Sequence, residues 1–154
     1  MFANTVARGR RSRGFTLVEL MAVVLIASIL LSIAVPLYMQ QVRKGRRTDA
    51  KTAVMDLAGR EERMFSTTNA YSIDPTQLGY AAVGSGAAFP QVVGNGYYNI
   101  TVAAPTATTF TITATAITAD QLKDTSCFSF SVTQTGAQSS LSSAGGSTTT
   151  TCWQ

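Results

Sequence analysis

The sequence predicts an α+β protein in which one long N-terminal helix, apolar in its first half and amphipathic in its second, packs on a small antiparallel β-sheet. Three observations carry this prediction. An apolar run fills residues 15–35, apolar residues then recur at spacings of three and four up to residue 65, and three runs of alternating apolar and polar residues follow between 98 and 132. With 154 residues, the chain has room for one modest core behind the helix.

The apolar run of residues 15–35 has the length and composition of a membrane-spanning helix. It contains 21 residues, which in an α-helix span about 31 Å, the hydrocarbon thickness of a bilayer. Its one charged residue is Glu19. A carboxylate inside a membrane is costly and by default marks a site with a partner.

A basic segment and a small residue precede this run. The segment carries Arg8, Arg10, Arg11 and Arg13, and Gly14 follows it directly. This order predicts a leader that is cut before the helix. A secretory signal fits less well, because its apolar region has only about 7–15 residues and ends at a small-residue cleavage site. An uncleaved anchor fits the hydropathy but leaves Glu19 unexplained.

The heptapeptide Gly14-Phe15-Thr16-Leu17-Val18-Glu19-Leu20 resembles the processing motif of type IV prepilins, which carry a class III leader. The resemblance implies that a prepilin peptidase, also the N-methyltransferase, cuts between Gly14 and Phe15 and that Phe15 is then N-methylated. It also implies that Glu19 neutralises the N-terminal ammonium of a neighbouring subunit during assembly. The expected partners are other pilin subunits in a homo- or heteropolymer, the peptidase, the inner membrane and the pilus assembly platform.

The positive charge of the chain belongs to the leader. The formal net charge is +4, and removing the four arginines of residues 1–14 leaves 12 − 4 = 8 basic against 8 acidic residues. Because basic residues stay on the cytoplasmic side, the rest of the chain is expected to face outward, into the periplasm of a Gram-negative cell. We therefore predict a leader (1–14), a transmembrane and polymerisation helix (15–36) and a periplasmic head (37–154). After assembly the mature chain is expected to be part of an extracellular pilus.

Pro36 lies where the apolar run ends. Proline kinks or ends a helix, but the helical pattern resumes at Leu37, and the pilins that the chain resembles carry a proline at the corresponding place. We therefore predict one long helix, kinked or loosened at Pro36 and continuing as an amphipathic helix over 37–65. Its apolar face consists of Ala50, Ala53, Val54, Leu57, Ala58, Met64 and Phe65, with a gap at Glu61.

Four positive charges occur within residues 43–47, Arg43-Lys44-Gly45-Arg46-Arg47. A solvated collar that meets acidic groups of adjacent subunits is the favoured interpretation. Contact with lipid headgroups and contact with nucleic acid are the alternatives.

The sequence of the rest of the head predicts an irregular connection, a sheet and a C-terminal loop. Residues 66–96 are rich in turn signals and resemble the αβ-loop of pilins. Residues 97–134 contain the three alternating runs of an antiparallel meander, with a threonine-rich outer face for solvent or subunit contact. Residues 135–154 contain few large apolar side chains, so they form a loop or a weak edge strand.

The two cysteines, Cys127 and Cys152, lie in the exported half. An even number of cysteines in an oxidising compartment favours a disulfide, and in pilins such a pair bounds the D-region. No metal or cofactor is expected, because the chain has no histidine and two thiols alone do not make a zinc site. No P-loop or G-x-S-x-G motif occurs either, so we expect no enzymatic activity.

The ending Thr151-Cys152-Trp153 and the run Cys127-Phe128-Ser129 resemble the PilE class of minor pilins, which is related to the DNA-uptake pilin ComP. This resemblance implies a structural subunit, a minor pilin, that supports pilus assembly, twitching motility or adhesion. A DNA-binding minor pilin for transformation and a pseudopilin of a type II secretion system are the alternatives. DNA is not the favoured partner, because residues 48–154 hold four basic and seven acidic residues, 4 − 7 = −3.

Overall fold

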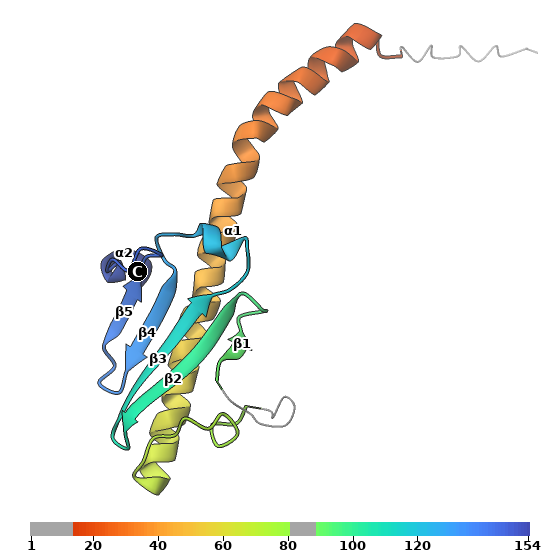
Figure 1. Ribbon diagram of the computed structural model, residues 1–154. Helices are drawn as coiled ribbons and strands as arrows, with labels where there is room; N and C mark the ends of the chain where they lie inside the picture. Colours follow the sequence, from red (N-terminus) through yellow and green to blue (C-terminus); the bar gives the residue numbers. More distant parts are fainter. Residues whose placement is uncertain (1–13, 81–88) are drawn as a thin grey trace, which may run out of the picture. The chain divides into compact units, whose positions relative to one another are not determined.

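The computed structural model describes residues 14–80 and 89–154 (Figure 1). The leader up to residue 13, and residues 81–88 of the expected αβ-loop, lie outside the described residues. The chain divides into two compact units, the first ending at Tyr38 and the second beginning at Met39. The second unit, residues 39–154, is the head as the structure defines it.

Helix α1 spans Leu17–Thr68 and includes Pro36, so the helix does not end at this proline. Its apolar part is long enough to cross a membrane by length and composition, with a mean hydropathy of 2.7 over an 18-residue window. The helix ends where the sequence changes to Ser, Thr and Asn. Asn69 adopts a left-handed conformation with φ of 56°, and its N–H donates to the Phe65 carbonyl at 2.8 Å, which is a common way to close a helix.

The sheet of the head is a five-stranded antiparallel meander in the order β1-β2-β3-β4-β5. Its strands are β1 (Gln91–Val93), β2 (Tyr98–Thr106), β3 (Thr109–Ala116), β4 (Ser129–Thr133) and β5 (Gln138–Leu141). A short 3-10 helix, η1 (Gln121–Lys123), lies between β3 and β4, and α2 (Thr149–Cys152) follows β5.

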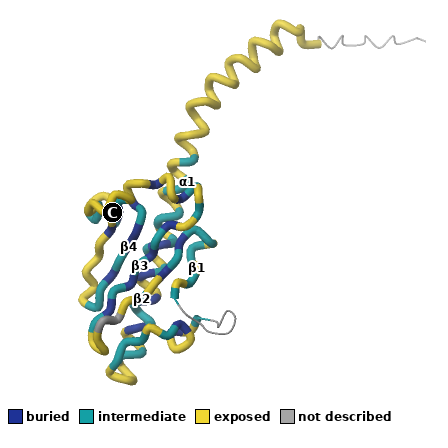
Figure 2. Tube along the Cα trace, viewed as in Figure 1, coloured by how far each residue is buried: buried dark blue, intermediate teal, exposed yellow. Residues whose placement is uncertain are grey.

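The core of the head forms between α1 and one face of this sheet. Alternation along β3 gives a strict pattern of buried and half-buried residues, and dark blue stretches mark the buried positions along β2, β3 and β4 in Figure 2. The apolar members are Ala50, Val54 and Leu57 of α1, with Tyr98, Ile100, Phe110, Ile112, Ala114, Phe130 and Val132 of the strands. Every buried residue among those described lies at or after Ala50. The head therefore has a complete core of its own.

Two segments differ from the prediction. Strand β1 lies inside residues 66–96, where we expect irregular chain, and it pairs with β2 in the register Val93↔Tyr98. The turn signal Gly94-Asn95-Gly96, with φ values of 60°, 55° and 91°, closes this hairpin instead of marking a loop. Residues 138–141 form an edge strand, which is one of the two alternatives that we expect there. Helix α2 is not predicted.

Candidate functional site

The first candidate site is the start of helix α1. Gly14 and Phe15 precede the helix, which begins at Leu17, and Phe15 is exposed. The Glu19 N–H donates to Thr16 Oγ1 at 3.2 Å, so Thr16 is the N-cap of α1. Glu19 is the third residue of the helix, position N3, where a capping box carries its glutamate. Sequence reasoning missed this cap, although T-x-x-E before an apolar run is its usual signal.

The carboxylate of Glu19 and the apolar side chains after it are exposed along the described part of the first unit. Glu19 makes no ion pair among the residues that the structure describes, and every residue from 17 to 38 is exposed. Such a continuous exposed apolar surface needs a membrane or neighbouring chains to cover it. The carboxylate sits in the first turn, where the helix dipole favours negative charge.

The second candidate site is a basic surface on the head. We use this name for Arg43, Lys44, Arg46, Arg47, Lys51 and Lys123. Arg46 Nη1 lies 2.6 Å from Asp120 Oδ2 and Arg43 Nη2 lies 3.4 Å from Asp120 Oδ1. The hydrogen bond from Arg46 is the main reason that the pKa of Asp120 is lowered, with Arg43 adding to it.

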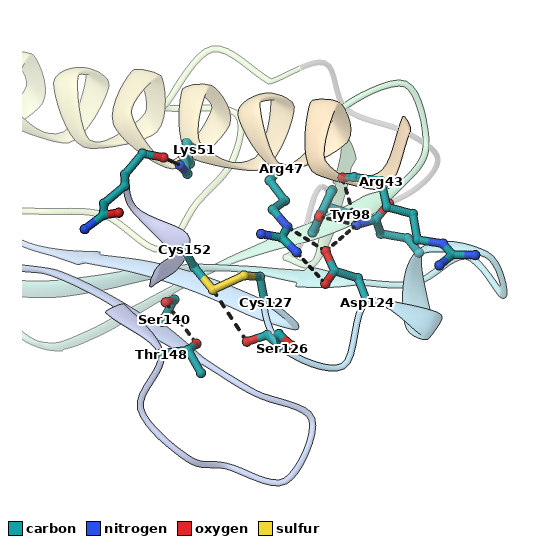
Figure 3. Close-up of polar contacts among 12 residues, drawn as sticks. Arg43, Arg47, Lys51, Tyr98, Asp124, Ser126, Cys127, Ser140, Thr148 and Cys152 are labelled. Atoms are coloured by element: carbon teal, nitrogen blue, oxygen red, sulfur yellow. Dashed lines mark hydrogen bonds and ion pairs between the residues drawn. A yellow bond between two sulfur atoms is a disulfide. The ribbon is translucent and has the colours of Figure 1, made fainter. Parts of the chain in front are cut away.

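Arg47 holds the second carboxylate of this surface. Its Nε and Nη2 lie 2.7 and 2.8 Å from the two oxygens of Asp124, and Figure 3 shows the side chain reaching from α1 to that residue. The arginines of residues 43–47 therefore meet acidic groups of their own chain. Asp120 and Asp124 come from a distant part of the same sequence, and contact of these arginines with acidic groups of adjacent subunits stays a prediction.

A buried polar network supports this ion pair. Gln121 is fully buried, and its Nε2 donates to the Tyr98 hydroxyl at 2.9 Å and lies 3.4 Å from Asp124 Oδ2. Burial, the largest cause, strongly raises the pKa of Tyr98. The network fixes η1, and with it Asp120 and Asp124, against helix α1.

Three lysines of the basic surface take no part in these ion pairs. Lys44 and Lys123 are exposed and have no ion pair within the described part of the chain. Lys51 Nζ donates to the Gln154 carbonyl at 3.1 Å and lies 5.9 Å from the centre of the Trp153 ring. Burial, with Arg47 nearby, lowers the pKa of Lys51.

The C-terminal segment is tied to the sheet. Cys127 and Cys152 form a disulfide, and the Trp153 Nε1–H donates to the Ser139 carbonyl at 2.8 Å. The Thr148 N–H donates to the Ser140 carbonyl at 2.9 Å. These bonds cover the outer edge of β5, which would otherwise expose unpaired backbone groups.

Glu61 is a buried acid that the helical pattern did not identify. It lies in the gap of the apolar face and is fully buried. Its Oε2 accepts a hydrogen bond from the Ser72 N–H at 3.1 Å, whereas its Oε1 has no hydrogen-bond partner among the residues that the structure describes. Burial raises the pKa of Glu61. Elsewhere in residues 14–80 and 89–154, His, Cys, Asp and Glu form no group of three or more that could hold a metal ion.

Comparison with known proteins finds similarity to type IV pilins. A model of the prokaryotic N-terminal methylation motif matches residues 9–35. The type IV major pilin protein PilA of Myxococcus xanthus is 38% identical over 71 residues, which are 46% of this chain and 32% of PilA, so the chain spans about a third of that relative. A type IV pilin structure from Shewanella oneidensis covers 62% of this chain and 89% of its own at 22% identity and a TM-score of 0.43.

A methylation motif that leads into an exposed apolar helix, followed by a helix-backed antiparallel sheet, defines a type IV pilin, the structural subunit of a pilus. The sequence of the head identifies one family within this class. The family model described as type IV minor pilin ComP, DNA uptake sequence receptor, matches residues 36–140, and the chain belongs to this family.

Proposed function

We propose that this protein is made as a single-span precursor in the inner membrane and is cut between Gly14 and Phe15. Phe15 is then N-methylated, and the mature chain enters a type IV pilus as a minor subunit with its head outside the inner membrane. The match of residues 9–35 to the methylation motif carries this proposal. The exposed Gly14-Phe15 segment before the first helical turn supports it, because a peptidase needs an accessible, non-helical substrate.

The role that we propose for Glu19 follows from charge burial. Cleavage creates a new ammonium group at Phe15, and assembly moves both charges into an apolar bundle of helices. A buried charge without a partner is strongly unfavourable, whereas a buried pair is tolerated. Glu19 has no intramolecular ion pair in the described residues, so it is free to pair with the ammonium of a neighbouring subunit.

The Glu19→Ala variant tests this role. We expect cleavage to proceed and incorporation into sheared filaments to fall, because the incoming ammonium loses its partner. Glu62→Ala is the matched control, since Glu62 is an exposed glutamate on the same helix. Cleavage is followed by intact mass and incorporation by immunoblot of the sheared fraction. Normal incorporation of Glu19→Ala would contradict the pairing.

DNA binding is the second function that we propose, and the family match favours it. The family is described as a DNA uptake sequence receptor. The unfavourable charge of −3 refers to residues 48–154, but the head begins at Met39 and so includes residues 43–47. Counted from there, the head holds eight basic and seven acidic residues, a net charge of +1.

Four of the seven acidic residues of the head are paired with arginines or buried. Asp120 and Asp124 pair with arginines of the basic surface, Asp56 pairs with Arg60, and Glu61 is buried. The exposed lysines of the basic surface, Lys44 and Lys123, offer the positive charge that contact with DNA phosphates uses.

A gel shift of the head, residues 39–154, with double-stranded DNA tests this function. We expect binding that weakens with salt, and we expect Lys51→Gln to reduce the salt slope by about 1, the value of one phosphate contact. Arg63→Gln removes the same charge from an exposed position outside the basic surface and serves as control. Absence of binding at low salt, or equal losses in both variants, would rule out this surface as the receptor.

A further inference from the structure

A polar hollow of about 230 Å³ opens on the basic surface of the head. One wall is helix α1 and the other is the segment that follows η1. It is lined by Gln40, Arg43, Lys44, Arg47, Lys123, Asp124, Thr125 and Ser126. All these residues belong to the head, so the hollow does not depend on the placement of the apolar part of the helix.

Positive charge is in excess around this hollow. Arg47 and Asp124 satisfy each other at 2.7 and 2.8 Å. Asp120 is shared between Arg46 at 2.6 Å and Arg43 at 3.4 Å, so Arg43 holds only the longer contact. Lys44 and Lys123 make no ion pair with the described residues, so five cations of this region face two carboxylates, a local charge of +3.

Hydrogen-bond donors are in excess as well. The Nε of Arg43 is buried and has no hydrogen-bond partner among the described residues, and a buried N–H without an acceptor is unfavourable. The hydroxyls of Thr125 and Ser126 lie on the exposed rim. Ammonium, guanidinium and hydroxyl donors around one small polar hollow match the oxygens of a phosphate group.

The sequence places this hollow close to a membrane. Lys44 is nine residues after Val35, the end of the apolar run. Helix α1 continues through these residues, so they rise about 14 Å. The headgroup layer of the bilayer and the long side chain of Lys44 together span about this distance.

We propose that this hollow binds the phosphate of an anionic phospholipid headgroup while the subunit waits in the membrane. The proposal rests on the membrane insertion proposed above. An occupied hollow holds the head at the surface of the bilayer, and the headgroup is released when the subunit moves into the filament. DNA that reaches the same face competes with the lipid for the lysines.

Vesicle co-sedimentation of the head, residues 39–154, tests the proposal without the apolar helix. We expect binding to vesicles of phosphatidylglycerol and phosphatidylcholine and none to phosphatidylcholine alone. The double variant Lys44→Gln, Lys123→Gln should weaken binding about 25-fold, since each basic residue near an anionic surface contributes about fivefold. Lys51→Gln, Arg63→Gln is the control, because it removes two charges outside the hollow.

The outcomes separate the alternatives. A loss confined to the Lys44 and Lys123 double variant, with displacement of the head by millimolar inorganic phosphate, supports the site. Equal losses in both double variants indicate diffuse attraction and overturn it. Phosphate or DNA binding that needs Lys44 and Lys123 without any vesicle binding assigns the hollow to another anion and also overturns it. Because the head lacks the processing site, failure here leaves the cleavage proposal intact, and uncleaved precursor in cells leaves the headgroup site intact.

Discussion

Replacing Asp124 by Asn should destabilise the head strongly. The carboxylate accepts hydrogen bonds from Arg47 at 2.7 and 2.8 Å, and the side chains of Arg47 and Asp124 are only 17% and 6% exposed. Removing one partner of a buried ion pair costs about 3–5 kcal/mol. Water still reaches Arg47, so we expect the lower end, about 3 kcal/mol of unfolding free energy, or about 15 °C in Tm for a domain of this size.

Urea unfolding of residues 39–154 measures this loss, and Asp56→Asn is its matched control. Asp56 also pairs with an arginine, Arg60 at 2.8 Å, but these side chains are 50% and 33% exposed. An exposed pair of this kind contributes about 0.5 kcal/mol. If Asp124→Asn lost no more stability than Asp56→Asn, the ion pair would not fix η1 to α1, and the description of the basic surface would be wrong.

Three further predictions concern the core of the head and are checked by urea unfolding. Glu61→Gln should stabilise the head at pH 7, because the folded-state pKa of Glu61 is raised above its ordinary value of 4.5. The contribution of Glu61 to the free energy of unfolding therefore falls as pH rises from 4.5 through the folded-state pKa. The variant should lose this pH dependence. A Glu61→Gln variant that is less stable at pH 7 would refute this. Cys127→Ser opens a loop with a sequence separation of 25 and should cost about 3 kcal/mol without affecting cleavage; an unchanged midpoint would contradict it. Leu57→Ala, at a fully buried position, should cost about 3 kcal/mol, and a loss below 1 kcal/mol would place Leu57 outside the core.

The sequence predicts the long elements of the fold because their patterns extend over many residues. Alternation along residues 109–116 identifies β3 and the face that it buries, and the spacing of Ala50, Val54 and Leu57 identifies the buried face of α1. Strand β1 has three residues and helix α2 has four. Such segments contain too few positions for any periodicity, and their partners in the sheet or the disulfide hold them in place.

The candidate sites differ in the same way. Gly14, Phe15 and Glu19 form one contiguous motif, so the proposed processing site can be read along the chain. The basic surface requires Arg47 and Asp124 to meet across 77 positions of sequence, and no local pattern contains that information. The charge count over residues 48–154 therefore includes the two aspartates but leaves out the arginines of residues 43–47 that pair with them.

The central claim is that Gly14 to Glu19 turn a membrane precursor into a subunit of a filament. Mass spectrometry of sheared pili tests this claim most directly. We predict a mature chain that begins at Phe15, carries one N-terminal methyl group and retains the Cys127–Cys152 disulfide. Recovery of the chain only from the membrane fraction, with residues 1–14 still attached, would contradict the claim.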